Sequence, residues 1–324
     1  TGEDVAADGI GGPICGWVVN SRDGSPTKEP PHPILADGKV RYVGDHVVAV
    51  LAESLEQAMY AAELVEIDYE VLAPVVDLGN ASAGVQIHEN VPDNMYFDFE
   101  LGDEAATEEA LSSATTVVEL EVRNNRVIPN AMEPRAAVAS YDPIDEAYTL
   151  YTTSQNPHLT RLVIGAFMLS IPESKLRVVA PDVGGGFGSK IYVYPEEAVC
   201  TWASQKVRRP VKWTADRSES FLADAHGRDH INKVKVALDA NNRITGLRVD
   251  SIANIGSYLS AFSVVTPTIL HAPLLSGCYK IPSIYTNVKG MATTTAPVDA
   301  YRGAGRPEAT YLLERMMDAA AREV

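Results

Sequence analysis

Apolar and polar positions near the start of the chain follow two different periods, which together predict a strand–helix–strand unit. Residues 40–52 and 64–76 are typical of strands. Between them, Ser54 and Gln57 form a capping box. The box precedes an apolar helical face that consists of Leu55, Ala58, Met59, Ala62 and Val65. We therefore expect a small α/β domain that ends near Val76.

The pattern changes twice in the next part of the chain. Residues 77–112 have little periodicity and many acidic residues, so we expect a linker that crosses the surface. Apolar and charged residues then alternate over 116–123, which predicts a half-buried strand. Two later segments are predicted to form hairpins, with turns at Asp142–Pro143 and Asn241–Asn242.

Three helices are indicated by their start signals. Asn156 as N-cap and Pro157 at the first helical position predict a short helix. A buried strand over 176–180 leads into a glycine-rich segment, and the helix 195–207 follows it. A last helix, with Pro307 near its start, closes the chain.

Composition and charge narrow the class of protein. The chain has 324 residues, of which 46% are hydrophobic and 22% charged, as in a globular protein with two domains. Residues 1–150 have a net charge of −21 and residues 151–324 one of +5. We therefore expect an anionic ligand to bind to the second half. The acidic first half argues against nucleic acid as a partner. The alternative is that the acidic residues only form a solvated surface. No apolar stretch of about 18 residues occurs, so we expect no membrane span.

The chain ends and the cysteines give two further expectations. The chain begins with Thr1, has no signal peptide and stops inside a predicted helix, so we expect a fragment of a longer protein. Cys15, Cys200 and Cys278 are far apart, which favours a reducing, cytoplasmic compartment over a disulfide framework. Three cysteines are too few to hold an iron–sulfur cluster on thiolates alone.

The segment "PDVGGGFGSK" (181–190) contains the strongest candidate for ligand binding. It is not a P-loop, because Ser189 replaces the second glycine and Ile191 the hydroxyl residue. Ser189 also breaks the dinucleotide fingerprint. Four glycines allow positive φ and close approach, and their N–H groups can bind an anion. A tight structural turn is the alternative, but it needs fewer glycines.

Three further stretches could contribute chemistry. Gln155 in "TTSQNPHL" ends a strand and can donate its amide N–H groups to an oxygen ligand. In "AYRGAGRPEA", Arg302 and Arg306 precede a helix, where arginine forks can bind anions, although a surface turn is the alternative. In "HGRDH" (226–230), two histidines have a metal-binding spacing, but a third ligand is missing and the next residues predict a strand.

Taken together and in this order, "TTSQNPHLTR", "PDVGGGFGSK" and "AYRGAGRPEA" resemble the large, molybdenum-binding subunit of the xanthine oxidase family of molybdenum hydroxylases. The segment "AYRGAGR" looks like the form II carbon monoxide dehydrogenase large chain. The resemblance implies an α+β fold. The C-terminal part of an α/β hammerhead domain (1–76) would be followed by a linker (77–112) and the first part of a molybdopterin-binding domain (113–324).

The resemblance implies a role for each matching residue. Gln155 would hydrogen-bond an oxygen ligand of molybdenum, and Gly303 would face the substrate. The cofactor would be bound by Gly185, Gly186, Phe187 and Gly188 on one side and by Ala300, Tyr301 and Arg302 on the other. The catalytic residues in this chain would be Gln155, Arg302 and Gly303.

The resemblance also implies a reaction and partners. The reaction is the oxidation of an aldehyde, an N-heterocycle or a CO-like small molecule, with water as the oxygen source. Molybdopterin, in its cytosine dinucleotide form, would carry the molybdenum, while [2Fe–2S] and FAD would sit on a small and a medium subunit in a dimer of heterotrimers. Copper is not expected, because Gly303 stands where copper-containing relatives have Cys. Ile191 replaces the Glu by which xanthine dehydrogenases orient purines.

Two other hypotheses about the function remain open. The family's general-base Glu has no match in these 324 residues, so the chain could be a non-catalytic fragment or paralogue that binds molybdopterin. A nucleotide-binding protein that uses the glycine loop for phosphate is the third possibility.

Overall fold

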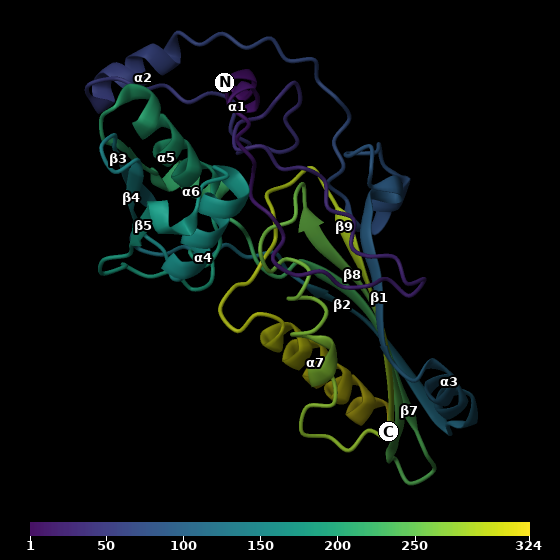
Figure 1. The fold of residues 1–324 in the computed structure, drawn as a ribbon. Coiled ribbons are helices and arrows are strands. Elements are labelled where there is room, and N and C mark those ends of the chain that lie inside the picture. The colour runs from purple at the N-terminus through teal and green to yellow at the C-terminus, as the bar shows by residue number, and fades with distance from the viewer. The chain divides into compact units, whose positions relative to one another are not determined.

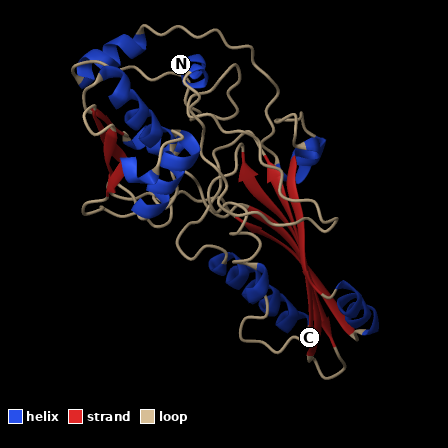
Figure 2. Ribbon diagram, in the orientation of Figure 1, coloured by secondary structure: helices blue, strands red, loops and turns tan.

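The computed structural model describes all residues from 1 to 324 and divides them into two compact units (Figure 1). Unit 1 consists of residues 1–14, 31–74 and 130–224, and unit 2 of residues 15–30, 75–129 and 225–324. Each unit has its own sheet, so each is described separately (Figure 2). None of the helices combines the length and apolar character that a membrane crossing needs.

Unit 1 is built on a four-stranded sheet with the strand order β5-β4-β3-β6. Its strands are β3 (Ala136–Asp142), β4 (Ala147–Thr152), β5 (Leu176–Val179) and β6 (Val211–Thr214). β3 and β4 form the antiparallel hairpin predicted around Asp142–Pro143, and β5 pairs with β4 in parallel. The parallel pair requires a long connection between them, which contains α4.

The helices of unit 1 surround this sheet. They are α1 (Gly2–Ala7), α2 (Leu55–Glu63), α4 (Pro157–Leu162), α5 (Pro195–Val207) and α6 (Arg217–Ala223), with the π-helical turn η3 (Val163–Met168) and the 3₁₀ turn η4 (Glu173–Lys175). α5 packs on β3, β4 and β6 and contributes Ala198 and Cys200 to the core. The predicted helices at 157 and 195–207 are thus confirmed.

Unit 2 is built on a five-stranded sheet with the order β1-β9-β8-β7-β2. Its strands are β1 (Met95–Gly102), β2 (Thr116–Asn124), β7 (His230–Leu238), β8 (Ile244–Gly256) and β9 (Ser283–Ala292). The predicted strand at 116–123 and the predicted hairpin between β7 and β8 are confirmed. Val118 and Val122 of β2 are buried, as alternation requires.

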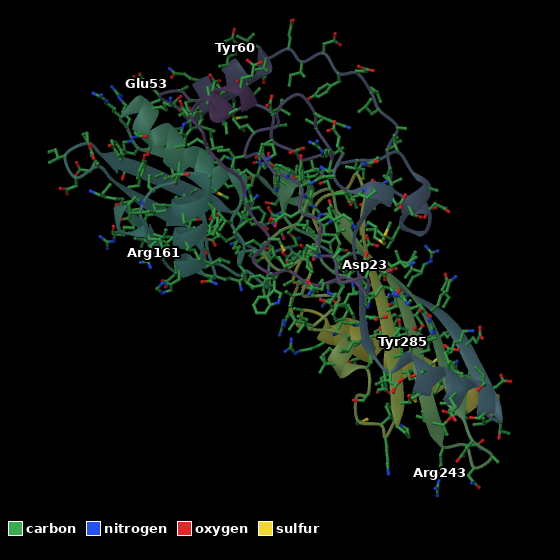
Figure 3. The ribbon with its side chains drawn as sticks, turned by 45° about the vertical axis from the view of Figure 1, so that its right-hand side comes forward. Asp23, Glu53, Tyr60, Arg161, Arg243 and Tyr285 are labelled. Carbon is green, nitrogen blue, oxygen red and sulfur yellow. The ribbon has the colours of Figure 1, made fainter.

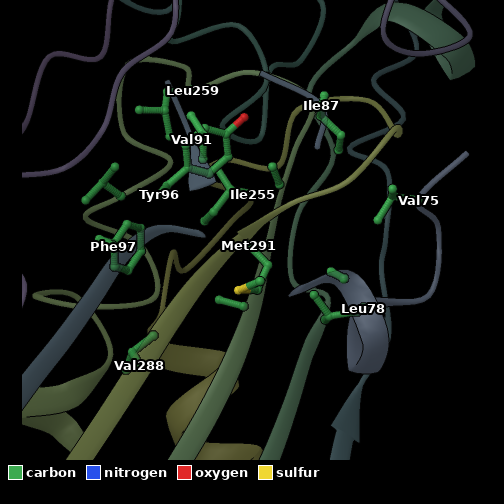
Figure 4. Packing of buried hydrophobic residues seen from close by; sticks show 14 of the residues in the cluster. Val75, Leu78, Ile87, Val91, Tyr96, Phe97, Ile255, Leu259, Val288 and Met291 are labelled. Carbon is green, nitrogen blue, oxygen red and sulfur yellow. The ribbon is translucent and has the colours of Figure 1, made fainter. Parts of the chain in front are cut away.

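Two helices cover opposite faces of the unit 2 sheet. α3 (Glu104–Ser113) approaches Gly246 of β8, whereas Leu247 packs with α7 (Arg306–Glu323), and successive strand residues point to opposite faces. A second cluster, with Tyr96, Phe97 and Met291 among its members, forms the rest of the core (Figure 4). The unit also contains the 3₁₀ turns η1 (Leu78–Ala83), η2 (Pro92–Asn94) and η5 (Ala272–Leu274).

The sequence prediction is wrong in two places. Residues 40–52 and 64–76 flank α2 as predicted, but they form no strands, because neither segment takes part in a ladder of backbone hydrogen bonds with another strand. Helix α2 buries no residue, and Tyr60 on it is 67% exposed (Figure 3). Residues 77–112 are not an irregular linker, because they contain β1 and α3. β1 forms a strand because it pairs with β9, which lies far along the chain.

Candidate functional site

The glycine-rich loop lies in unit 1 between β5 and α5, as predicted. Gly185, Phe187 and Gly188 have φ angles of 96°, 53° and 110°. Glycine adopts this region at little cost, whereas Phe187 is strained in it. A side chain at Gly186 would overlap with the side chain of Gln155. The glycines are therefore required both by the backbone conformation and by the close approach of Gln155.

The side-chain amide oxygen of Gln155 holds this residue against the glycine loop. It lies between the end of β4 and Asn156, the N-cap of α4. Its Oε1 accepts hydrogen bonds from the N–H groups of Gly188 (3.0 Å) and Lys190 (3.3 Å). Its Nε2 has no partner in the structure, and the side chain is exposed. The amide N–H groups are thus free to donate to an oxygen of a bound group.

Two residues that the sequence analysis did not single out close the glycine loop at its base. The Nζ of Lys190, which is 2% exposed, donates to the carbonyl and to Oε2 of Glu133, both at 2.8 Å. The same Oε2 accepts from the N–H of Gly184 at 2.8 Å. Partial burial raises the pKa of Glu133, but the bonds from Lys190 and Gly184 outweigh it and lower the pKa overall.

A buried charge network fixes the helix that follows the loop. Arg135 donates to Asp224 (2.6 Å) and, through both Nη atoms, to Glu196 in the first turn of α5. Its guanidinium lies 3.6 Å from the ring centroid of Tyr194, and His46 contacts Glu196 at 3.0 Å. Burial raises the pKa of Glu196, yet Arg135 and His46 lower it well below its usual range. The network anchors the point at which the loop ends.

The second predicted loop, in the segment 300–309, lies in unit 2 between β9 and α7, and its residues from Arg306 onward form the start of α7. The N–H of Ala304 donates to the carbonyl of Tyr301 at 2.7 Å and closes a turn. Gly303, at its third position, has a φ of 99°, which is typical of a type II turn. Arg302 and Gly303 are exposed, and Arg302 forms no ion pair in the structure. A cation without a carboxylate partner is suited to an anionic ligand.

A buried carboxylate holds the start of this loop. Asp299 accepts hydrogen bonds from the N–H groups of Ala300 (2.5 Å) and Phe262 (2.9 Å) and from the hydroxyl of Ser260. Burial raises the pKa of Asp299 to about 7, although these bonds act in the opposite direction. Asp299 thus connects the loop to residues 260–263.

The "HGRDH" segment does not form a helix. His226 lies in an isolated bridge and His230 begins β7 with a buried side chain. No group of three His, Cys, Asp or Glu side chains in the chain is arranged to hold a metal ion. Instead, Arg228 contacts the second loop, where its partners Tyr301 and Arg302 are 73 and 74 residues away in sequence.

The structure therefore brings together part of the predicted site. Gln155 contacts the loop that contains Gly186 and Gly188 within unit 1, and Ala300 to Gly303 form one turn region in unit 2. Glu133 was not predicted from the sequence, because its partners are more than 50 residues away. The burial of Arg135 in "MEPR" and of Glu196 and Glu197 in "PEE" marks charged side chains that must pair, but only the structure shows it.

Comparisons with known proteins agree with this picture. The molybdopterin cofactor-binding domain matches residues 87–324, and the aldehyde oxidase and xanthine dehydrogenase a/b hammerhead domain matches residues 6–73. The carbon monoxide dehydrogenase large chain of Hydrogenophaga pseudoflava is 37% identical over 310 residues, which cover 90% of this chain and 38% of that one.

Solved structures are similar over the whole chain. Quinoline 2-oxidoreductase from Pseudomonas putida 86 has a TM-score of 0.91 and 31% identity, covering 99% of this chain and 40% of that one. A Cu,Mo-CO dehydrogenase has a TM-score of 0.89 and 29% identity, covering 100% and 41%. The chain thus spans about two fifths of the length of these relatives.

The fold and the match over residues 87–324 define the class. The chain belongs to the xanthine oxidase family of molybdopterin-binding proteins. Its fold is α+β and combines hammerhead and molybdopterin-binding domain sequence, as the motifs predicted.

Proposed function

We propose that this chain is part of the large subunit of a molybdenum hydroxylase. The observation that carries the proposal is Gln155, whose carbonyl is tied to the glycine loop while its amide N–H groups have no partner. A donor fixed in this way needs no reorganisation when an oxygen-rich group binds. When bound, the molybdenum cofactor would supply oxygen-atom transfer and two-electron redox chemistry.

The other predicted residues would share the binding of the cofactor. Gly185 to Gly188 would lie over it, with little side-chain bulk except at Phe187, which is 44% exposed. Ala300, Tyr301 and Arg302 would contact it from the second loop. Gly303, which has no side chain, would leave room for the substrate, and Arg302 would add positive charge near an anionic group.

The substrate and partners follow from the same site. We propose an aldehyde or N-heterocycle in preference to carbon monoxide, because position 303 has no thiolate to bind copper. Molybdopterin in its cytosine dinucleotide form would carry the metal. Electrons would pass to an iron–sulfur subunit and an FAD subunit in a dimer of heterotrimers. The three unpaired cysteines favour the cytoplasm as the site of assembly.

Elemental analysis of the full-length complex, produced from its native operon, tests this function. We expect molybdenum without copper in the wild-type complex and less molybdenum in Gln155→Ala. His158→Gln, a change at an exposed residue on α4, is the control and should keep the wild-type content. Copper together with molybdenum would refute the argument from Gly303. Absence of both metals from a folded complex would refute the enzyme.

The second candidate is a binding protein that keeps the cofactor site but has no general base. It is favoured by the contacts of Gln155 with the glycine loop, which hold a donor for an oxygen-bearing group and involve no general base. Turnover of an aldehyde or a heterocycle by the molybdenum-loaded complex would exclude it. A molybdenum-loaded complex without turnover on either class would support it.

A further inference from the structure

The segment 226–230 adopts a costly conformation that the proposed function does not explain. Arg228 and Asp229 both have positive φ angles, 65° and 72°, which residues with side chains rarely adopt. A Cβ atom on Gly227 would lie 2.5 Å from the Cβ of Tyr301. Such strain persists only where surrounding contacts enforce it, and it is common at functional sites.

Asp229 provides one set of these contacts. Its Oδ2 accepts from the Nε of Arg126 at 2.8 Å and from the amide of Asn254 at 2.9 Å. The remaining donors of Arg126 reach the carbonyl of Ala296 (3.1 Å) and the hydroxyl of Thr295 (2.7 Å), upstream of the second loop. The bonds of Asp229 to Arg126 and to Asn254 of β8 therefore hold the segment 226–230 against the sheet.

Arg228 provides the other set and reaches the second loop itself. Its Nη1 donates to the carbonyl of Tyr301 at 3.0 Å, and its Nη2 to that of Arg302 at 2.9 Å. Its guanidinium lies 4.7 Å from the ring centroid of Tyr301. Nη1 also pairs with Oε1 of Glu308, in the first turn of α7, at 3.1 Å. One buried side chain thus fixes two successive peptide groups and the helix that they lead into.

This arrangement determines where the neighbouring N–H groups point. In a trans peptide the N–H is directed opposite to the carbonyl, and no peptide bond of the chain is cis. With the carbonyls of Tyr301 and Arg302 turned toward Arg228, the N–H groups of Arg302 and Gly303 face away from it. Neither N–H has a partner in the structure, and both residues are exposed. They form a pair of preorganised donors.

We infer that Arg228 is a positioning residue, which holds the turn 301–303 so that the N–H groups of Arg302 and Gly303 together bind an oxygen-bearing anionic group of cofactor or substrate. The inference rests on the proposed function for the identity of that group. The positioning itself rests only on contacts within unit 2. Lysine cannot replace Arg228, because a single ammonium cannot span both carbonyls and Glu308 in a fixed fork.

The experiment compares Arg228→Lys with Arg248→Lys in the full-length complex. Arg248 is a matched control in the same unit, since it also pairs with carboxylates (Asp250 and Glu108) and its guanidinium lies 5.0 Å from the ring centroid of Tyr285. Figure 3 labels Tyr285 on the unit 2 sheet. It donates to no loop carbonyl. We expect exchange of the Ala304 amide, which is hydrogen-bonded to the carbonyl of Tyr301, to rise about tenfold or more in Arg228→Lys and to stay at the wild-type rate in the control.

A second readout reports the ligand. In the molybdenum-loaded complex, Arg228→Lys should alter the Mo(V) electron paramagnetic resonance spectrum and lower kcat, while Arg248→Lys leaves both unchanged. Exchange and spectrum at wild-type values in Arg228→Lys would overturn the inference. If the wild-type complex contains no molybdenum, the proposed function fails, but the exchange comparison still decides whether Arg228 positions the turn.

A further variant separates positioning from general destabilisation. Glu308→Gln removes the buried charge but keeps the two bonds from Arg228 to the loop carbonyls. We expect exchange of the Ala304 amide to stay within about twofold of wild type in Glu308→Gln. Equal loosening in Glu308→Gln and Arg228→Lys would show that the ion pair, and not the carbonyl contacts, holds the turn, and would overturn the inference. Should Arg228→Lys fail to assemble, Arg228→Gln with Glu308→Gln leaves no unpaired buried charge and tests the same contacts.

Discussion

Lys190 illustrates how one side chain can stabilise a loop that consists mostly of glycine. Its ammonium group, together with the N–H of Gly184, converges on Glu133, so the loop is closed at its base by one carboxylate. The loop residues themselves contribute few side-chain contacts. The position of the backbone N–H groups therefore depends on this junction.

Replacing Lys190 by Met should destabilise unit 1 by about 1–3 kcal/mol, because a buried hydrogen-bonded ammonium is removed and Glu133 loses its partner. Lys206→Met is the control, because its ion pair with Asp8 is exposed and should be worth about 0–1 kcal/mol. Urea unfolding of the full-length subunit measures both. An equal, small effect of the two substitutions would show that the Glu133 junction does not stabilise the loop.

The residues of the candidate site differ in how far the sequence could reveal them. Gln155 and the glycines belong to short local motifs, so their chemistry is visible within a few positions. Glu133 and Arg228 act on partners 51 to 80 residues away, and only the folded chain brings these groups together. The two arginines Arg228 and Arg302 look alike in sequence, but one is buried and paired while the other is exposed.

Elements with local signals were predictable, and elements that depend on distant pairing were not. The Asn156–Pro157 start of α4 and the helix α5 agree with prediction because capping and φ preference act within one turn. Strands at 40–52 and 64–76 were predicted from alternation, but a strand also needs a partner. β1 was missed although Phe97, Phe99 and Leu101 alternate with acidic residues.

The cap of α4 offers a test at the scale of the element. The side chain of Asn156 accepts from the N–H of Leu159 at 3.2 Å, and Gln155 directly precedes it. Asn156→Ala should lower the free energy of unfolding by about 1 kcal/mol, whereas Asn156→Asp should keep it within a few tenths. Thermal unfolding of the two variants measures the difference. Equal stabilities would show that the cap does not determine the start of the helix.

At the scale of the whole molecule, the two units are interleaved along the sequence. Both units contain segments from the acidic first half and from the basic second half. The charge difference between the halves therefore does not assign an anionic ligand to one unit, and the local position of the exposed, unpaired Arg302 is the better guide. The interleaving arises from long-range pairing, such as that of β1 with β9, which periodicity alone does not encode.

The buried histidines make the stability of the molecule depend on pH. Burial lowers the pKa of His230 to about 3 and that of His271 to about 4, against about 6.5 in an unfolded chain. Below pH of about 6.5 the unfolded state takes up protons that the native state does not, so the free energy of unfolding falls by about 1.4 kcal/mol per pH unit for each histidine. Asp299 acts in the opposite direction, because burial raises its pKa to about 7 and the native state takes up its proton first.

The histidines and Asp299 change the free energy of unfolding in opposite directions as the pH falls. The effect of one histidine is therefore measured as the difference in this free energy between wild type and His271→Gln. Between pH 6.5 and 4.5 the wild-type subunit should lose about 2–3 kcal/mol more than the variant, because glutamine has no proton to take up. His158→Gln, at an exposed position, should follow the wild-type profile. Urea unfolding at several pH values measures all three. His271 contacts the carbonyl of Gly305 in the second loop through its Nδ1. Parallel profiles for wild type and His271→Gln would mean that His271 takes up a proton in the native state, and hence that its surroundings admit water or a counter-charge.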